Sequence, residues 1–347
     1  MKNFFLWLKT LFNPPNISAL PVSNPPYIDY SNDYIIPIPG AADDAFLYCF
    51  PIEGTYQNML NIVNQRLNFS PLNQKVRYFP LSEKILMVFS DIKKGYTLDP
   101  NYKKYGCLEE KALQIFMPIV ECIPDAHNNW VAQRILFFIP YIFIDQPFSL
   151  SIGREVFGFE KSLANFEFPD SPENANNFQL NAFGFKHFDK SNPEFGKYHP
   201  LITIKKTDGD IEEGAWETHD EAWEDIKQHL DTKNRNSEFN IGLPFIIHEL
   251  KDLFHKTVPM IFLKQFRDII DPTKACYQAI TEGNGIAEEF LGGWFLGSEY
   301  EITIENIASF PIAEDLGLKS KIIVKKPFWT HSNLRFESGK ILWKSST

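Results

Sequence analysis

The sequence predicts a mainly β protein of the α+β class, built on a closed or strongly curved antiparallel sheet with a few helices between the strands. Short runs rich in β-branched and aromatic residues recur along the chain, and most are bounded by Pro, Asn, Asp or Gly. They do not alternate regularly with helices, which argues against a doubly wound parallel sheet. The 32 Phe, 13 Tyr and 7 Trp among 347 residues supply a sizeable core. A closed sheet of this kind can also enclose an apolar cavity.

Residues 1–41 are expected to form an N-terminal helix followed by an extended arm. The run Phe4–Leu8 is apolar, but Lys9 interrupts it, and Pro14 and Pro15 end the helical pattern. The run is too short to span a bilayer and lacks the longer apolar core of a signal peptide. An amphipathic helix is expected instead, packed on the protein body, on a neighbouring subunit or on a membrane surface.

Residues 42–347 are expected to form a single domain with an insertion around residues 187–255. In its first part, the segment Tyr56–Leu67 has apolar residues at helical spacing and predicts a helix. Pro140 predicts a bend between two strands. The strands predicted in this part are Ala45–Ile52, Val76–Phe79, Ile85–Phe89, Ala112–Val120, Trp130–Phe138 and Tyr141–Ile144.

The second part of the domain continues the strand pattern. Thr218 followed by Glu221 is a capping box and predicts a helix over residues 218–230. A polar loop at 231–240 and a helix over Phe245–Phe254 follow. The dipeptides Asn284-Gly285 and Ser338-Gly339 predict turns between strands. The predicted strands are Asn165–Phe168, Phe178–Phe185, Leu201–Lys205, Met260–Phe266, Ala275–Ile280, Gly293–Leu296, Tyr300–Ile304 and a hairpin within Asn333–Trp343.

Charge and cysteine content limit the classes of partner. The formal net charge of −10 argues against nucleic acid as a partner, which would require a basic face. The four cysteines are widely spaced and form no CxxC pair, so we interpret them as free thiols in a reducing, cytoplasmic compartment. They are Cys49, Cys107, Cys122 and Cys276.

Common metal and phosphate motifs do not match. His248-Glu249 has Asp252 where a zinc protease has its second histidine, and His255 lies too far along the chain. We therefore expect no metal site. Gly283-Asn284-Gly285 matches neither GxGxxG nor GxxxxGKS, and the chain has no GxSxG motif for a nucleophilic serine.

The segment GREVFGFEKSL, residues 153–163, places a single lysine in an apolar setting. Lys161 is preceded by Val156, Phe157 and Phe159 and followed by Leu163. Either Lys161 points out of a strand or turn into water, as most lysines do, or it points into a dry pocket that changes its chemistry.

This segment resembles the signature of the acetoacetate decarboxylase family. Members of that family carry Gly-Arg-Glu, a short apolar and aromatic run, and a Schiff-base lysine six residues after the glutamate. Here Glu155 and Lys161 have that spacing. The stretches YIFID at 141–145, VPMIFLKQFRDI, ACYQAITEGNGIAEEFLGGWF and ASFPIAEDLGL also resemble the family, so that the likeness extends over residues 42–320.

The resemblance implies a cone-shaped antiparallel β-barrel with a few peripheral helices and an apolar internal pocket. Lys161 would lie in the pocket and form an imine with a keto acid, without a cofactor. Burial would have to lower the pKa of this lysine, because an amine with the ordinary pKa near 10.4 is almost fully protonated at neutral pH. The lysine of acetoacetate decarboxylase is itself a standard example of such activation.

The resemblance also implies roles for other residues. Glu121 would be the acid–base or substrate-orienting carboxylate, and Gln114 would replace a second family glutamate. The substrate-binding residues would be Arg154, Glu155, Phe157, Phe159 and Gln114. The resemblance further implies a homo-oligomer.

Two departures from the family pattern bear on the substrate. Ser162 stands where the family usually has a second lysine, and Glu160 precedes Lys161; if the sequence alternates faces here, Glu160 points away from Lys161. The family arginine that binds a substrate carboxylate falls on Asp43 or Asp44.

The first functional expectation is therefore a Schiff-base lyase that decarboxylates a keto acid. The alternatives are aldolase-dehydratase chemistry on an α-keto acid and a non-catalytic barrel that binds a small ligand. A further alternative is an assembly protein whose N-terminal helix and arm make subunit contacts.

Overall fold

The structure is a computed structural model, and it describes residues 27–28, 38–69, 72–102, 104, 106–208, 214–227, 257–297 and 299–345. The chain divides into a small unit, Met1–Tyr34, and a large unit, Ile35–Thr347. The expected N-terminal helix, the polar loop at 231–240 and the helix at 245–254 lie outside the described residues. No helix among the described residues is long and apolar enough to cross a membrane.

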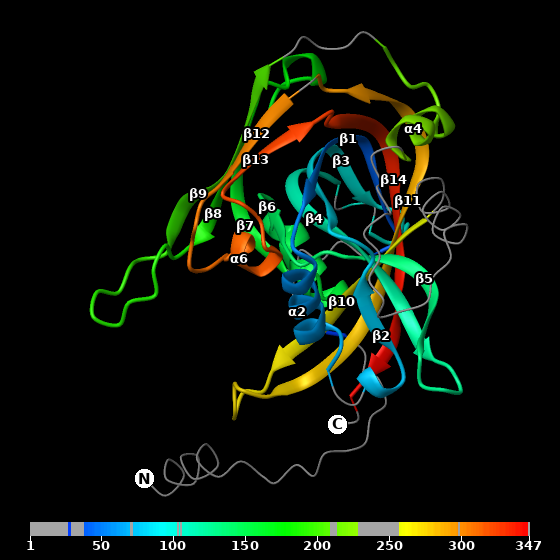
Figure 1. The fold of residues 1–347 in the computed structure, drawn as a ribbon, viewed down its shortest axis with the longest axis vertical. Coiled ribbons are helices and arrows are strands. Elements are labelled where there is room, and N and C mark those ends of the chain that lie inside the picture. The colour runs from blue at the N-terminus through cyan, green and yellow to red at the C-terminus, as the bar shows by residue number, and fades with distance from the viewer. Residues whose placement is uncertain are drawn as a thin grey trace, which may run out of the picture. The chain divides into compact units, whose positions relative to one another are not determined.

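Most of the described chain of the large unit is β-strand, with a few short helices, as the sequence predicts (Figure 1). The strands of the first half are β1 (Gly40–Glu53), β2 (Arg77–Pro80), β3 (Lys84–Thr97), β4 (Cys107–Pro124), β5 (Trp130–Phe138), β6 (Ile142–Ile144) and β7 (Lys161–Glu167). Those of the second half are β8 (Asn177–Gly184), β9 (Lys197–Asp208), β10 (Thr257–Arg267), β11 (Ala275–Phe295), β12 (Glu299–Ile304), β13 (Lys321–Lys325) and β14 (Phe328–Lys344).

The described helices are short and lie between strands. They are α2 (Tyr56–Arg66), α3 (Pro147–Ile152), α4 (His219–Ile226) and α6 (Ile312–Leu316), with 3₁₀ turns η1 (Leu72–Gln74) and η4 (Pro172–Asn174) and a π-helical turn η3 (Gly153–Phe157). Helix α2 forms because its apolar residues recur at helical spacing, and it buries Met59, Leu60, Ile62 and Val63. Helix α4 begins at the predicted N-cap, where Thr218 Oγ1 accepts a hydrogen bond from Glu221 N at 3.3 Å.

In the described part of the chain the strands form one 14-stranded sheet, ordered β13-β12-β9-β8-β7-β6-β4-β3-β1-β14-β11-β10-β5 with β2 beside β4. Strand β5 also pairs with β4. The pairings β4-β3-β1-β14-β11-β10-β5 therefore return to β4 and close a circuit, in which only β5 and β10 run parallel. Strand β9 is a regular member of the sheet, although it lies within the range expected as an insertion.

Two predicted turns are wrong. Asn284-Gly285 lies inside the 21-residue strand β11, and Ser338-Gly339 lies inside the 17-residue strand β14. Between the pairs Glu282–Lys340 and Asn284–Glu337 the register shifts, so one residue of β11 faces two of β14. The glycine dipeptide on β14 marks a β-bulge rather than a chain reversal.

The largest core lies on one face of the sheet and is rich in aromatic rings. Phe178 of β8 packs edge-on against Tyr48 and Phe50 of β1, with ring centroids 5.0 and 5.3 Å apart. Strand β4 contributes every second residue to this core, namely Leu113, Ile115, Met117 and Ile119. The intervening residues of β4, Gln114 and Phe116, therefore belong to the opposite face. We call this opposite face the motif face, because Lys161 lies on it.

Candidate active site

The first part of the motif, Gly153–Phe157, is a π-helical turn that continues helix α3, whereas Lys161 itself begins strand β7. Gln146 caps α3 and Pro147 occupies its first turn. The helix continues into η3 and stops at Gly158, whose φ of 84° is left-handed. A Cβ at Gly158 would lie 2.6 Å from the Cα of Lys264, so only glycine fits this turn. The chain then returns, and β7 begins at Lys161.

Strand pairing places Lys161 on the motif face. Ile142 of β6 is in register with Lys161 of β7 on one side and with Gln114 of β4 on the other. Ile142 belongs to an apolar cluster with Met260 and Phe262, against which Phe159 packs. The side chain of Lys161 therefore lies next to apolar side chains where it leaves the backbone.

The Lys161 side chain is buried, with 9% of the residue exposed. Its Nζ lies 2.7 Å from Ser149 Oγ, which is a neutral partner, and 5.8 Å from the centre of the Phe159 ring. Burial lowers the pKa of the Lys161 amine, and the negative charge of Glu110 opposes this effect. The direction is the one that an imine-forming lysine requires.

Glu160, the preceding residue, does not act on this amine. Its carboxylate contacts Arg66 Nη1 of α2, and Arg66 Nη1 also donates to Pro140 O at 2.9 Å. Burial raises the pKa of the Glu160 carboxyl overall, although the positive charges of Arg66 and Arg154 oppose this effect. Successive residues at the start of β7 thus point in opposite directions, and Glu160 faces α2.

The two charged residues of the Gly-Arg-Glu motif are exposed. Arg154 Nη1 donates to the backbone carbonyl of Lys161 at 3.0 Å, which fixes the motif turn against the start of β7. Burial lowers the pKa of the Lys264 amine, and the negative charge of Glu155 opposes this effect in part. Lys264 Nζ donates to Val156 O at 3.1 Å. The side chains of Arg154 and Lys264 therefore brace the turn.

Phe157 and Phe159 stack on each other with ring centroids 4.6 Å apart. Phe159 continues the stack to Phe262, 4.1 Å away. Phe157 lies on the sheet at the β11–β14 bulge, where Thr281 Oγ1 donates to Phe157 O at 2.5 Å. The two rings anchor the turn on β10 and β11, and Phe159 also borders the lysine.

Gln114 shares the motif face with Lys161. Its Oε1 accepts a hydrogen bond of 2.8 Å from Ser90 Oγ of β3. Glu110 lies four residues earlier on the same strand and so on the same face. The sequence expectation did not include Glu110 or Ser149, although alternation along β4 from Gln114 would have indicated Glu110.

Glu121 is not brought to Lys161. It lies seven residues beyond Gln114, roughly 23 Å along an extended strand, and on the opposite face. Arg134 of β5 binds both of its carboxylate oxygens, at 2.8 and 2.9 Å, and Tyr78 donates to it at 3.1 Å. Arg134 Nη1 also lies 2.7 Å from Glu282 Oε2. Glu121 is part of an ion-pair network at the other end of β4.

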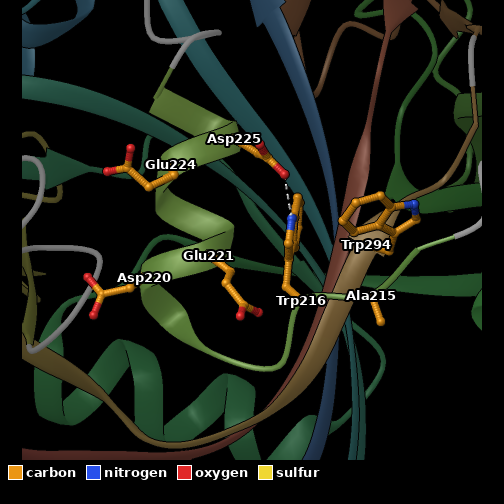
Figure 2. Close-up of a pocket in the computed structure, with 7 residues that line it drawn as sticks. All are labelled: Ala215, Trp216, Asp220, Glu221, Glu224, Asp225 and Trp294. Atoms are coloured by element: carbon orange, nitrogen blue, oxygen red, sulfur yellow. Dashed lines mark hydrogen bonds between the residues drawn. The ribbon is translucent and has the colours of Figure 1, made fainter.

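Residues 214–227 of the predicted insertion also cover the motif face. Trp216, Ala222 and Ile226, from α4 and the segment before it, pack with Cys49 of β1 and Val88 of β3. Val88 is the register partner of Gln114. A cleft of about 450 Å³ opens between α4 and β11, and Figure 2 shows the indole of Trp216 between the helix and Trp294. Four carboxylates border this cleft, those of Asp220, Glu221, Glu224 and Asp225, so it disfavours anionic ligands.

Among the described residues, no group of three or more His, Cys, Asp or Glu side chains is arranged to hold a metal ion. Asp43 and Asp44, the positions matched to the family arginine, are paired elsewhere: Tyr96 donates to Asp43 at 3.3 Å, and His331 Nε2 lies 2.8 Å from Asp44.

The fold is the one found in acetoacetate decarboxylase and the enzymes similar to it. The structure of acetoacetate decarboxylase from Legionella pneumophila subsp. pneumophila strain Philadelphia 1 superposes with a TM-score of 0.55 and 12% sequence identity, over 96% of each chain. A second acetoacetate decarboxylase structure gives 0.52 and 11%, over 90% of this chain and 93% of that one. The enduracididine biosynthesis enzyme MppR complexed with pyruvate gives 0.51 and 11%, over 89% and 92%. No family model and no curated protein sequence matches the chain. At these identities the likeness establishes the fold.

Proposed function

We propose that this protein is a Schiff-base lyase in which Lys161 forms an imine with a small keto acid, with decarboxylation as the reaction. The observation that carries the proposal is the buried Lys161 amine, whose hydrogen-bond partner Ser149 is uncharged. A lysine structurally committed to an ion pair would have a carboxylate at that distance. The apolar cluster that contains Ile142, the register partner of Lys161, and that packs against Phe159 would keep water from the amine.

The chemistry follows from the properties of an iminium ion. The neutral amine adds to the ketone carbon, and loss of water gives a C=N bond that carries a positive charge. In a β-keto acid, the bond between the α-carbon and the carboxylate then breaks, its electrons move to the nitrogen, and CO₂ leaves. The resulting enamine takes a proton at the α-carbon, and water releases the ketone and the free lysine.

The neighbouring side chains have separate roles in this proposal. Gln114 uses its Oε1 for Ser90, which leaves the Nε2 amide to donate to a substrate oxygen. Glu110 is the carboxylate that stabilises the positive charge at Lys161. Phe159 and Ile142 exclude water. Arg154 holds the turn through the Lys161 carbonyl, and Glu121 acts within the Arg134 network rather than on substrate.

A second candidate is an aldol-type condensation or a dehydration on an α-keto acid. MppR, whose fold this chain shares, has been described in complexes with pyruvate and with the condensation product of pyruvate and imidazole 4-carboxaldehyde. The same imine serves both reactions, because it accepts electrons either from a breaking C–C bond or from a lost α-proton.

Borohydride trapping separates these chemistries from a non-catalytic ligand-binding protein. The full-length protein is incubated with acetoacetate, pyruvate and a panel of further keto acids, reduced, and mapped by peptide mass spectrometry, with Lys161→Ala as the control. A keto acid-dependent adduct at Lys161 supports the imine, and release of CO₂ identifies decarboxylation. Saturable binding of a keto acid without an adduct would replace the proposal with the non-catalytic alternative.

A further inference from the structure

The Lys161 side chain lies along one side of helix α3 and its π-helical extension. A Cβ built at Gly153 would lie 2.6 Å from Lys161 Cδ and 2.7 Å from its Cε. Gly153 therefore leaves the space through which the aliphatic part of Lys161 passes. Ser149 lies four residues before Gly153, which is one helical turn and the same side of the helix. The terminal nitrogen reaches Ser149 Oγ at 2.7 Å.

This contact is specific to Ser149 among the serines of α3. Ser151, two residues later, points elsewhere and donates to the backbone carbonyl of Pro147 at 3.3 Å. The helix itself is fixed by the Gln146 cap and by Gly158, so the position of Ser149 relative to β7 is set by the fold. The charged groups that face the amine or its backbone are Glu110 of β4 and Arg154 of η3.

We infer that Ser149 is a catalytic residue of imine formation, which holds the Lys161 nitrogen and passes a proton from that nitrogen to the substrate oxygen. The inference rests on the proposed function. A serine hydroxyl accepts a hydrogen bond from the ammonium form and donates one to the neutral form, so it suits both states of the lysine.

Each proton that moves during imine formation has a donor and an acceptor. When the neutral nitrogen attacks the carbonyl carbon, a new N–C bond forms and the C=O π electrons move to oxygen. Ser149 accepts a proton from the nitrogen as it gives its own to that oxygen, which yields a neutral carbinolamine. The C–O bond then breaks, the oxygen leaves as water after taking a second proton from solvent, and the nitrogen lone pair forms the iminium.

The test compares two properties of Lys161 in the full-length protein: its acylation by acetic anhydride between pH 6 and pH 10, and its borohydride trapping with a keto acid that labels the wild type. Removing the acceptor in Ser149→Ala destabilises the ammonium and lowers the pKa of the lysine further, because hydrogen bonds to charged groups are the stronger ones. Acylation at pH 7 should therefore become about three- to tenfold faster. Trapping should become slower, because the amine is no longer held and has lost its proton carrier.

Ser149→Thr keeps the hydroxyl and should restore both rates in part, and the matched control Ser151→Ala should leave both unchanged. General loosening of the site would expose Lys161 and raise the pKa toward that of a solvated amine, which would slow acylation. The inference is overturned if Ser149→Ala behaves as the wild type in both measurements, or if both rates fall together. An absence of wild-type adducts with every keto acid would instead overturn the proposed function, while the acylation profile would still report the contact.

Discussion

Gly153 and the aliphatic part of Lys161 occupy adjoining space so closely that any Cβ at position 153 would force the lysine side chain to shift. The three nearest atoms to a Cβ there are Cδ, Cε and Cγ of Lys161, at 2.6, 2.7 and 3.3 Å. A glycine at the first position of the Gly-Arg-Glu motif thus avoids a steric clash with the lysine eight residues later. Position 153 has helical φ and ψ, so its glycine serves close approach and not an unusual backbone conformation.

Gly153→Ala should therefore displace the Lys161 amine. The added methyl group pushes against Cδ and Cε, and we expect imine trapping to fall on the order of a hundredfold. Overpacking should lower the free energy of unfolding by about 1–3 kcal/mol, which urea denaturation measures. Gly95→Ala is the matched control, since a Cβ there meets only Leu108 O at an ordinary 3.5 Å. Equal trapping by Gly153→Ala and wild type would contradict this account of the glycine.

Lys161→Met should change how stability depends on pH. Burial lowers the pKa of Lys161 in the folded protein, while the unfolded chain has the ordinary value near 10.4. Between those two pKa values the unfolded state binds more protons, so the wild type gains stability as pH rises and reaches its full stability above the unfolded pKa. Below the pKa that Lys161 has in the folded protein, the wild type bears the full free-energy cost of burying the ammonium.

The stability of Lys161→Met relative to wild type should accordingly be greatest at the low end of this window and decrease toward pH 10. The slope is at most about 1.4 kcal/mol per pH unit. Urea denaturation at pH 7, 8, 9 and 10 gives the slope. Lys205→Met, at an exposed position on β9, provides the comparison. A pH-independent difference between Lys161→Met and wild type would mean that the amine is not buried as described.

Glu110, and not Glu121, should be the carboxylate that acts on Lys161. Glu110→Gln removes the negative charge that raises the pKa of Lys161, so acylation of Lys161 at neutral pH should become faster with little change in stability. Glu121→Gln breaks the two-point contact with Arg134 and should destabilise the protein by about 1–3 kcal/mol, while Lys161 acylates as in the wild type. The opposite pattern, with Glu121→Gln altering Lys161, would return Glu121 to the catalytic role.

The Arg134 network explains why this assignment requires the structure. Burial lowers the pKa of Arg134, but its pairs with Glu121 and Glu282 outweigh burial and raise it. Distance along the sequence matched Glu121 to a lysine-facing glutamate, but the side of a strand alternates with each residue. Glu121 and Gln114 differ by an odd number of positions and therefore point to opposite faces. Alternation was readable from the sequence, whereas the cross-strand partner Arg134 was not.

Elements with strong periodicity were predicted closely. The β5 strand has the predicted bounds, Trp130–Phe138, and α2 ends one residue before the predicted helix. Both signals are local: an uninterrupted run of strand-forming residues, and apolar residues at helical spacing. The spacing between Glu155 and Lys161 is local as well, so the sequence alone could single out Lys161 as a candidate.

The elements that were missed depend on distant contacts. Gly339 interrupts strand-like sequence and suggested a turn, yet it lies under the ring of Phe157, which a Cβ there would meet at 3.5 Å. Gly283, beside the predicted Asn284-Gly285 turn, lies under the same ring, which a Cβ there would meet at 3.1 Å. A sequence does not show that an aromatic ring from a motif more than a hundred residues away lies on the sheet there. Glycine in a strand can mark such a close approach. Ser149 is not identifiable from the sequence for the same reason, because a helix and a π-turn bring it to its partner Lys161.

The packing of α4 on the motif face gives the last prediction. Trp216 is almost fully buried, its ring lies 5.1 Å from that of Phe295, and its Nε1 donates to Asp225 at 2.8 Å (Figure 2). Trp216→Ala removes a large buried side chain and should cost about 3–5 kcal/mol of unfolding free energy. Asp225→Asn retains an acceptor for the indole and should cost about 1 kcal/mol or less.

The two variants also test whether α4 protects the lysine from solvent. Because the Trp216 cluster includes Val88, the register partner of Gln114, loosening α4 should admit water to the motif face and raise the pKa of Lys161 toward that of a solvated amine. Acetic anhydride labelling at neutral pH should then become slower in Trp216→Ala, under conditions where circular dichroism shows the variant folded. Asp225→Asn should label as the wild type. Unchanged labelling in folded Trp216→Ala would show that the cluster around Phe159 and Ile142 keeps the amine dry without α4.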